Sequence, residues 1–217
     1  MVQIHTKRKT RDEILALSVP LFAEHGYDGV SMRDVAGVAG VSPAALYYHF
    51  PDKEHLYFDV VAHECREKAA ALKTDADNPA SPWEQIEKFI NNLTRLAATD
   101  EDFMRLMQWV RLDCDEIRRQ KLAEHVFRDL FVDVYDLAAK LNTRFDAHML
   151  AMSIVGLVLF SLESRKISKF MPGHRPEQDD PAVLSQHVIE LLQLGLTNPK
   201  GRRDMDKPHS ETLGTLS

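Results

Sequence analysis

The residues whose types and spacing carry the clearest chemistry lie in one run, Ser31 to Lys53, which reads SMRDVAGVAGVSPAALYYHFPDK. Five apolar side chains in this run are spaced to form a small core between two short helices: Val35, Ala36, Val41, Leu46 and Phe50. Gly40 supplies the left-handed residue that a tight turn between these helices needs. Small side chains occupy the outward first turn of the second helix: Pro43, Ala44 and Ala45. They allow this helix close access to a major groove, so the run predicts a helix-turn-helix that binds DNA.

Three helix-start signals position these residues. Thr10 and Glu13 have the spacing of a capping box, and apolar residues follow at helical spacing until Gly26, which predicts a first helix. The second and third helices begin at N-cap serines, the latter followed by a proline at the first helical position: Ser31 and Ser42.

The segment AGVSPAALYYHFPDKEHL, with FAEHGYDGVSMRDVA before it, closely resembles the TetR family of bacterial regulators. The resemblance covers Thr10 to about Val61, roughly a quarter of the chain. The first helix, Gly26-Tyr27, the turn, the LY-x-HF segment and the lysine after it all fall in register. The resemblance implies a sequence-specific DNA-binding transcriptional regulator, by default a repressor that a small apolar or amphipathic ligand releases from its operator.

The resemblance also implies which side chains contact DNA. Arg33 and the residues from Pro43 to Tyr48 would face base edges, and an arginine there can hold guanine O6 and N7 in a bidentate contact worth about 1–3 kcal/mol of discrimination. Specificity would rest mainly on Arg33 and Tyr48, with methyl contacts from Ala44 and Ala45. Phosphates would be held by the side chains or N-terminal amides of the remaining predicted site residues: Ser31, Ser42, Tyr47, His49 and Lys53. The alternative is that the two tyrosines are half-buried packing residues and that Arg33 is only a charged residue on a solvent-exposed helix face. His49 would then cap a helix or pack against its neighbours rather than bind phosphate.

Two residues depart from the family pattern. Pro20 lies inside the first helix, and an interior proline kinks a helix, so we expect a bend near Ala16. The bend leaves open where the basic residues Lys7 to Arg11 lie relative to DNA. Gly37 is a weak helix former on the expected solvent side of the second helix, and no function is apparent for it.

Helix signals continue to about residue 196, and strand signals are nearly absent. The later helices are predicted over 52–72, 81–98, 101–113, 115–142, 146–171 and 181–196, with a connector over 73–81. The sequence thus predicts an all-α fold of about nine helices. It divides into a helix-turn-helix DNA-binding domain (1–52), a connecting helix (53–72), a helical ligand-binding and dimerisation domain (73–196) and a disordered tail (197–217).

The last two long helices, about 146–171 and 181–196, would form a four-helix interface with a second copy, as the resemblance implies for a homodimer. The stretch around Met149 to Leu162 leaves almost no polar face, so this helix must be covered on more than one side. An interior helix of a monomer is the alternative.

A pocket for an apolar ligand is predicted between the fifth and eighth helices, although any one of these side chains is a common core residue. Flexible methionine and large aromatic side chains suit such a pocket. The candidate lining residues are Phe103, Met107, Trp109, Val110, Phe127, Phe131, Tyr135 and Phe160. Arg111 or Arg118 would either orient a ligand carboxylate or pair with nearby acids such as Asp113.

The sequence lacks an HExxH pair, a GxSxG motif, a P-loop and a dinucleotide fingerprint, so we expect no enzyme activity, no metal site and no cofactor. The net charge of −6 argues against a general nucleic-acid coat protein. Four of the first eleven residues are basic and none is acidic, which fits either a local phosphate contact or a solvated tail.

Two cysteines, Cys65 and Cys114, are too few for a disulfide framework, so a cytoplasmic location is expected and a redox switch is a less favoured hypothesis. A signal-peptide pattern is absent. The most apolar stretch is shorter than the ~20 residues of a membrane span, which predicts a buried helix and no membrane partner. One alternative function stays open, a DNA-associated interaction protein whose C-terminal domain binds a protein partner rather than a small ligand.

Overall fold

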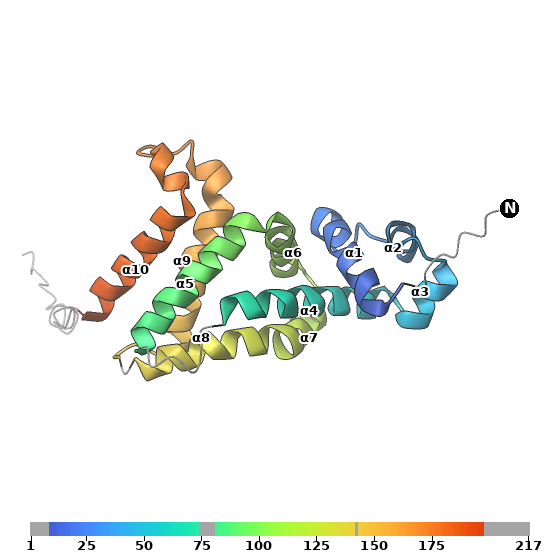
Figure 1. Ribbon diagram of the computed structural model, residues 1–217, viewed down its shortest axis with the longest axis horizontal. Helices are drawn as coiled ribbons and strands as arrows, with labels where there is room; N and C mark the ends of the chain where they lie inside the picture. The colour runs from blue at the N-terminus through green and yellow to red at the C-terminus, as the bar shows by residue number, and fades with distance from the viewer. Residues whose placement is uncertain (1–8, 74–80, 142, 198–217) are drawn as a thin grey trace, which may run out of the picture.

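The computed structural model describes residues 9–73, 81–141 and 143–197, and all regular structure within these ranges is helical (Figure 1). The expected all-α class is confirmed. The helices are α1 (Arg11–His25), α2 (Met32–Ala39), α3 (Pro43–His49), α4 (Lys53–Leu72), α5 (Pro82–Thr99), α6 (Glu101–Leu112), α7 (Glu116–Leu122), α8 (Arg128–Lys140), α9 (Ala147–Ser168) and α10 (Pro181–Thr197). A short 3-10 helix, Pro176–Asp179, precedes α10.

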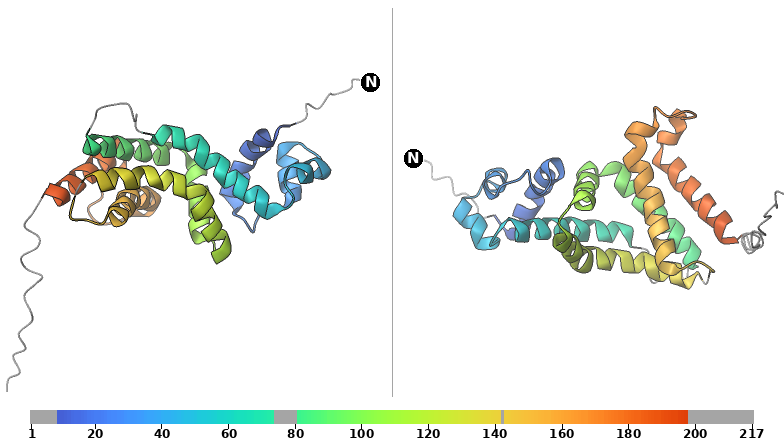
Figure 2. Two further views of the ribbon diagram at one scale, coloured as in Figure 1. Left: turned by 90° about the horizontal axis from the view of Figure 1, so that it is seen from below. Right: turned by 180° about the vertical axis from the view of Figure 1, so that it is seen from behind.

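The helix predicted over 115–142 is continuous but has an unexpected bend (Figure 2). α7 passes through a π-helical segment, Ala123–Phe127, directly into α8. Counted as one bent helix, α7 and α8 leave nine helices in the described ranges, as the sequence predicts. The predicted tail after 197, most of the connector over 73–81, and the basic residues Lys7 and Arg8 lie outside the described residues.

The molecule is elongated, with α1, α2 and α3 together at one end and α10 at the other (Figures 1 and 2). We call α1 to α3 the head and α4 to α10 the body. α4 runs from the head into the body, where α5, α8, α9 and α10 gather, while α6 and α7 lie next to the head. The α3 helix is therefore presented at a free end of the molecule.

The helix starts are those that the sequence predicts. Capping boxes are present at Thr10, Ser31 and Ser81, each closed by an acidic side chain three residues later. Ser42 Oγ accepts from the backbone N–H of Ala45 at 3.2 Å. Gly40 has φ 66 and ψ 34, the left-handed conformation expected between α2 and α3.

Pro20 lies inside α1 without ending it. A proline at this position cannot donate to the carbonyl oxygen of Ala16, but both residues are on the exposed side of the helix, where solvent can reach that oxygen. The bend expected near Ala16 remains a prediction.

Two apolar cores follow one another along the long axis. The first joins the head to α4 and α6, with Phe22, Phe50 and Tyr57 fully buried in it. The second is formed by α5, α8, α9 and α10 around residues such as Ile90 and Ile154. Because the first core crosses from the head into the body, the position of the head depends on α4 and α6.

Gly26, which ends α1, brings the head into close contact with the body. Its backbone has φ 67 and ψ −175, and a Cβ added there would lie 2.8 Å from the Trp109 ring of α6. The Trp109 indole N–H donates to the carbonyl oxygen of Ala23 at 3.1 Å, which occupies an acceptor at the C-terminal end of α1. A residue without a side chain is required here both by the backbone conformation and by the indole.

We predict opposite effects for alanine at two glycines. Gly26→Ala should lower the free energy of unfolding by about 2–4 kcal/mol, because a strained φ adds to a clash with Trp109. Gly37→Ala should raise it by about 0.5–1 kcal/mol, because that α2 position is exposed with no atom within 4 Å of the new Cβ. Urea unfolding followed by circular dichroism measures both, and equal effects would contradict the packing described.

Candidate nucleic-acid interface and ligand cavity

The outward face of α3 carries the residues predicted to meet base edges. Leu46 and the C-cap residue Phe50 are fully buried and fix the inner face of the helix. Tyr47 and Tyr48 remain 53% and 74% exposed. These tyrosines are therefore surface residues rather than packing residues. Small residues precede them on the same helix: Pro43 and Ala44, which are exposed, and Ala45, which is partly buried.

Arg33 is exposed on α2, and its guanidinium forms no hydrogen bond or ion pair with any residue that the structure describes. The two N-cap serines differ. Ser31 Oγ accepts from the Asp34 N–H and donates to Asp34 Oδ2 at 2.6 Å, so its hydroxyl is committed to the cap. These bonds hold the pKa of Asp34 below its ordinary value. Ser42 uses only its oxygen for the cap, which leaves its hydroxyl proton for an outside acceptor.

Two of the predicted phosphate-binding residues are packed against aromatic rings. The His49 ring lies 5.2 Å from that of Tyr48 and 6.2 Å from that of Phe50, between centroids. Lys53 Nζ donates to the carbonyl oxygen of Tyr27 at 3.1 Å and lies 4.2 Å from the centroid of the Tyr27 ring. Lys53 is thus held in place in the absence of DNA.

Arg11 is the one residue of the basic N-terminal group whose side-chain partners the structure describes. Its Nη2 is bonded to Asp59 Oδ2 of α4, and its guanidinium carbon lies 5.1 Å from the Phe50 ring centroid. Arg11 therefore connects the start of α1 to α3 and α4.

A cavity of about 250 Å³ lies in the body, with walls from α5, α6, α8 and α9. Five predicted residues line it: Phe103, Met107, Val110, Phe127 and Phe131. Seven further apolar residues that were not predicted from the sequence also line it: Leu72, Phe89, Leu93, Leu130, Val134, Val155 and Leu159. Each sits on an apolar helix face that periodicity identifies, but periodicity does not tell which faces converge.

Three predicted lining residues do not line this cavity. Trp109 packs on Gly26. Tyr135 is 40% exposed, with its ring 6.5 Å from that of Phe131, and Phe160 is 71% exposed. Tyr135 and Phe160 directly follow the lining residues Val134 and Leu159 on their helices, but their side chains are directed to the surface.

Arg111 is the one charged side chain in the cavity wall. Its Nη2 is bonded to Glu163 Oε1 of α9, and the two side chains are 44% and 20% exposed. Arg118, the other arginine considered for a ligand carboxylate, pairs instead with Asp113, as the alternative in the sequence analysis holds.

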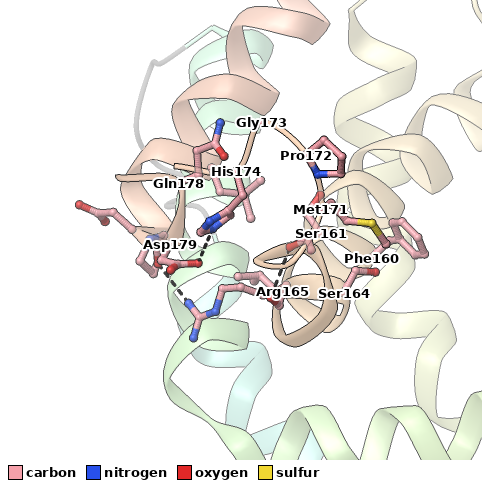
Figure 3. Close-up of a pocket in the computed structure, with 15 residues that line it drawn as sticks. Phe160, Ser161, Ser164, Arg165, Met171, Pro172, Gly173, His174, Gln178 and Asp179 are labelled. Atoms are coloured by element: carbon pink, nitrogen blue, oxygen red, sulfur yellow. Dashed lines mark hydrogen bonds and ion pairs between the residues drawn. The ribbon is translucent and has the colours of Figure 1, made fainter. Parts of the chain in front are cut away.

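A second hollow, of about 460 Å³, lies between the end of α9 and the start of α10 (Figure 3). Its polar groups bind one another, since Arg165 Nη1 donates to the Asp179 carbonyl oxygen at 3.2 Å and His174 Nε2 lies 3.3 Å from Asp179 Oδ1. Phe160 lies at the opposite edge of this groove. The groove is lined by serines and charged side chains as well as apolar ones, so for an apolar effector it is a weaker candidate than the cavity.

α9 and α10 leave an apolar face exposed. The exposed large side chains on these helices include Met149, Met152, Phe160, Ile167, Leu191 and Leu194, with fractions from 48% to 71%. α9 is the one described helix that is long and apolar enough to cross a membrane, with a mean hydropathy of 1.6. The expectation of a buried helix therefore holds for only one side of it, where Leu150, Ile154 and Val158 are buried.

Cys65 and Cys114 are both free thiols, one buried and one exposed. Burial raises the pKa of the Cys65 thiol to about 12, so this residue is a weak nucleophile at neutral pH. Within the described ranges, His, Cys, Asp and Glu side chains form no group of three that could hold a metal ion.

Comparison with known proteins agrees with this geometry. The model of bacterial regulatory proteins of the tetR family matches residues 14–60. The HTH-type transcriptional regulator AcrR of Shigella flexneri is 26% identical over 130 residues, which are 59% of this chain and 60% of AcrR. The HTH-type transcriptional activator FasR of Mycolicibacterium smegmatis is 28% identical over 195 residues, 87% of this chain and 83% of FasR. The HTH-type transcriptional repressor Rv1474c of Mycobacterium tuberculosis is 30% identical over 137 residues, 57% of this chain and 73% of the repressor.

Solved structures share the fold. FadR from Bacillus subtilis, in complex with stearoyl-CoA, superposes with a TM-score of 0.70 at 19% identity and covers 84% of this chain and 97% of FadR. AibR, in complex with isovaleryl coenzyme A and operator DNA, gives a TM-score of 0.62 at 19% identity and covers 82% of this chain and 95% of AibR. The family model matches the head, and the chain covers 73% of Rv1474c at 30% identity. This chain therefore belongs to the tetR family of bacterial regulatory proteins and is a helix-turn-helix transcriptional regulator.

Proposed function

We propose that the protein binds a specific operator through α3 as a repressor and is released from it by a small amphipathic ligand. The observation that carries the proposal is the exposure of Tyr47 and Tyr48 on a helix at the free end of the molecule. Rv1474c is a repressor and FasR an activator, and the default of the family favours repression. A partner that is chromosomal DNA implies a cytoplasmic location.

In this proposal α3 enters the major groove and the exposed arginine of α2 accompanies it. Arg33 holds a guanine, and Tyr48 with the methyl groups of Ala44 and Ala45 contacts neighbouring bases. The residues at the rim of α3 bind phosphates and set the register: Tyr47, His49, Lys53, the hydroxyl of Ser42 and the N-terminal turn at Ser31.

The test is binding to an operator duplex selected in vitro by the wild-type protein, compared with a scrambled duplex at fixed salt. Arg33→Ala and Tyr48→Ala should each weaken operator binding by about 10- to 100-fold and leave scrambled-DNA affinity nearly unchanged, because base contacts carry the discrimination. Arg105→Ala, which removes an exposed charge from α6, is the control. Fluorescence anisotropy measures each affinity, and equal losses on both duplexes would contradict base recognition by these residues.

The cavity suggests the class of effector. Its walls are apolar except for Arg111, a combination that suits an apolar tail joined to an anionic group. FadR and AibR were crystallised with acyl thioesters of coenzyme A, which have this character. A volume of about 250 Å³ is below the roughly 300–1,000 Å³ of common ligand pockets, so we propose a short or branched acyl group.

Cavity variants test the effector site. Leu159→Trp fills the cavity and should abolish binding of acyl-CoA, whereas Arg111→Gln should weaken binding about tenfold by removing a charge-assisted contact. Arg105→Gln on the outer side of α6 is the matched control. Isothermal titration with isovaleryl-CoA and longer acyl-CoAs gives the affinities, and thermal melting checks that each variant is folded. Undiminished binding by the filled variant would show that the effector binds elsewhere.

We also propose that the exposed apolar face of α9 and α10 is covered by a second copy of the chain. A regulator that binds DNA through two helix-turn-helix domains needs two copies of the chain. Pairing α9 and α10 of one copy with those of the other would bury the exposed apolar side chains of these helices, such as Met149 and Leu194. Sedimentation equilibrium should give twice the chain mass of 24.7 kDa, and Leu191→Glu should give the monomer. A wild-type monomer would instead favour the alternative in which this face binds a different protein.

A further inference from the structure

Tyr27, in the turn after α1, is contacted by cations from two different helices. Lys53, at the start of α4 beside the proposed DNA face, lies with Nζ 4.2 Å from the Tyr27 ring centroid and bonds its carbonyl oxygen. Arg118, on α7, has its guanidinium carbon 3.9 Å from the same centroid. A residue of the DNA face and a residue of the body therefore share one aromatic ring.

Arg118 is fixed by a bidentate ion pair. Its Nε and Nη2 donate to the two carboxylate oxygens of Asp113, the second bond at 2.9 Å, and the two side chains are only 12% and 6% exposed. The backbone N–H of Asp115 donates to the same carboxylate at 2.9 Å. The bonds from Arg118 hold the pKa of Asp113 below its ordinary value, so the pair is charged at neutral pH. Bidentate pairing sets the plane of the guanidinium, which is why Arg118 contacts Tyr27 in one orientation.

Fixing Tyr27 also fixes Lys53. The Tyr27 ring meets the fully buried Tyr57 edge-on at 5.2 Å, so it is held from the core as well as by Arg118. Lysine has a flexible four-carbon stem, and ordering that stem costs entropy when it binds a phosphate. A lysine already held at the Tyr27 carbonyl oxygen and ring has part of that cost removed.

The Asp113–Arg118 pair stands between two elements that form the cavity wall. α6 contributes Met107, Val110 and Arg111 to the wall and ends one residue before Asp113. α7, which carries Arg118, continues through the π-helical segment, whose last residue Phe127 also lines the cavity. A ligand that separates α6 from the bent α7–α8 helix would therefore move Asp113 relative to Arg118.

We propose that the Asp113–Arg118 pair is a latch that positions Lys53 for a phosphate contact through Tyr27, and that the cavity acts on DNA affinity through this latch. Arg118 is a positioning residue, because at 12% exposure it does not itself reach DNA. The inference rests on the proposed operator binding.

The test measures the salt dependence of binding to the selected operator for a set of variants of the full chain. Lys53→Gln and Arg118→Gln should each reduce the slope of log affinity against log salt by about 2 in a dimer, one phosphate contact per head, and the double variant should show no further loss. Arg119→Gln, the adjacent exposed arginine, should leave the slope unchanged. Arg118→Lys keeps the charge but not the bidentate pair, so it should not restore the slope.

A wild-type slope for Arg118→Gln, full rescue by Arg118→Lys, or additive losses in the double variant would each overturn the latch. If Arg118→Gln does not fold, Tyr27→Leu takes its place with the same expected loss, and an unchanged slope again overturns the proposal. A wild-type protein without operator preference would instead overturn the proposed function and the latch with it, so the two failures are distinguishable.

Discussion

The contact between Gly26 and Trp109 is the constraint on which the arrangement of this regulator depends. The indole can lie against the end of α1 only because residue 26 has no side chain, and its N–H bonds the Ala23 carbonyl oxygen. α1 is thereby docked on α6, and α6 is also a wall of the cavity. A ligand that shifts α6 is therefore expected to shift α1 as well, and with it α2, which packs on α1.

A second contact joins α4 to the start of α6. Lys68 of α4 pairs with Asp100, the N-cap of α6, at 2.6 Å and with the buried Glu64 at 3.3 Å. Burial raises the pKa of Glu64 despite the nearby Lys68 charge. α4 and α6 are thus joined directly by the Lys68–Asp100 ion pair, while Trp109 joins α6 to α1. This arrangement suits a head that moves as a unit, because packed interfaces shift between discrete states rather than deform continuously.

The sequence predicts the head almost completely, because its signals are local. The capping boxes, Gly40 and Pro43 each act within four residues, and the helices begin where these residues place them. The cavity is predictable only in part. Met107 and Val110 line it and Trp109 does not, a distinction set by rotation of α6 about its axis and by its neighbours. Tyr27 contacts both Lys53 and Arg118, which follow it by 26 and 91 positions in the sequence. No short sequence window contains all three residues. The π-helical segment has no recognisable sequence signal.

The central claim is that ligand binding in the cavity and DNA binding by the head are coupled. Reciprocal titration tests this coupling most directly. The affinity for the selected operator is measured with and without saturating acyl-CoA, and the affinity for the same acyl-CoA is measured with and without operator. The account predicts that both affinities fall by one common factor, in the range of about 5- to 150-fold that coupling energies usually give. Tight binding of both ligands with neither affinity changed would contradict it.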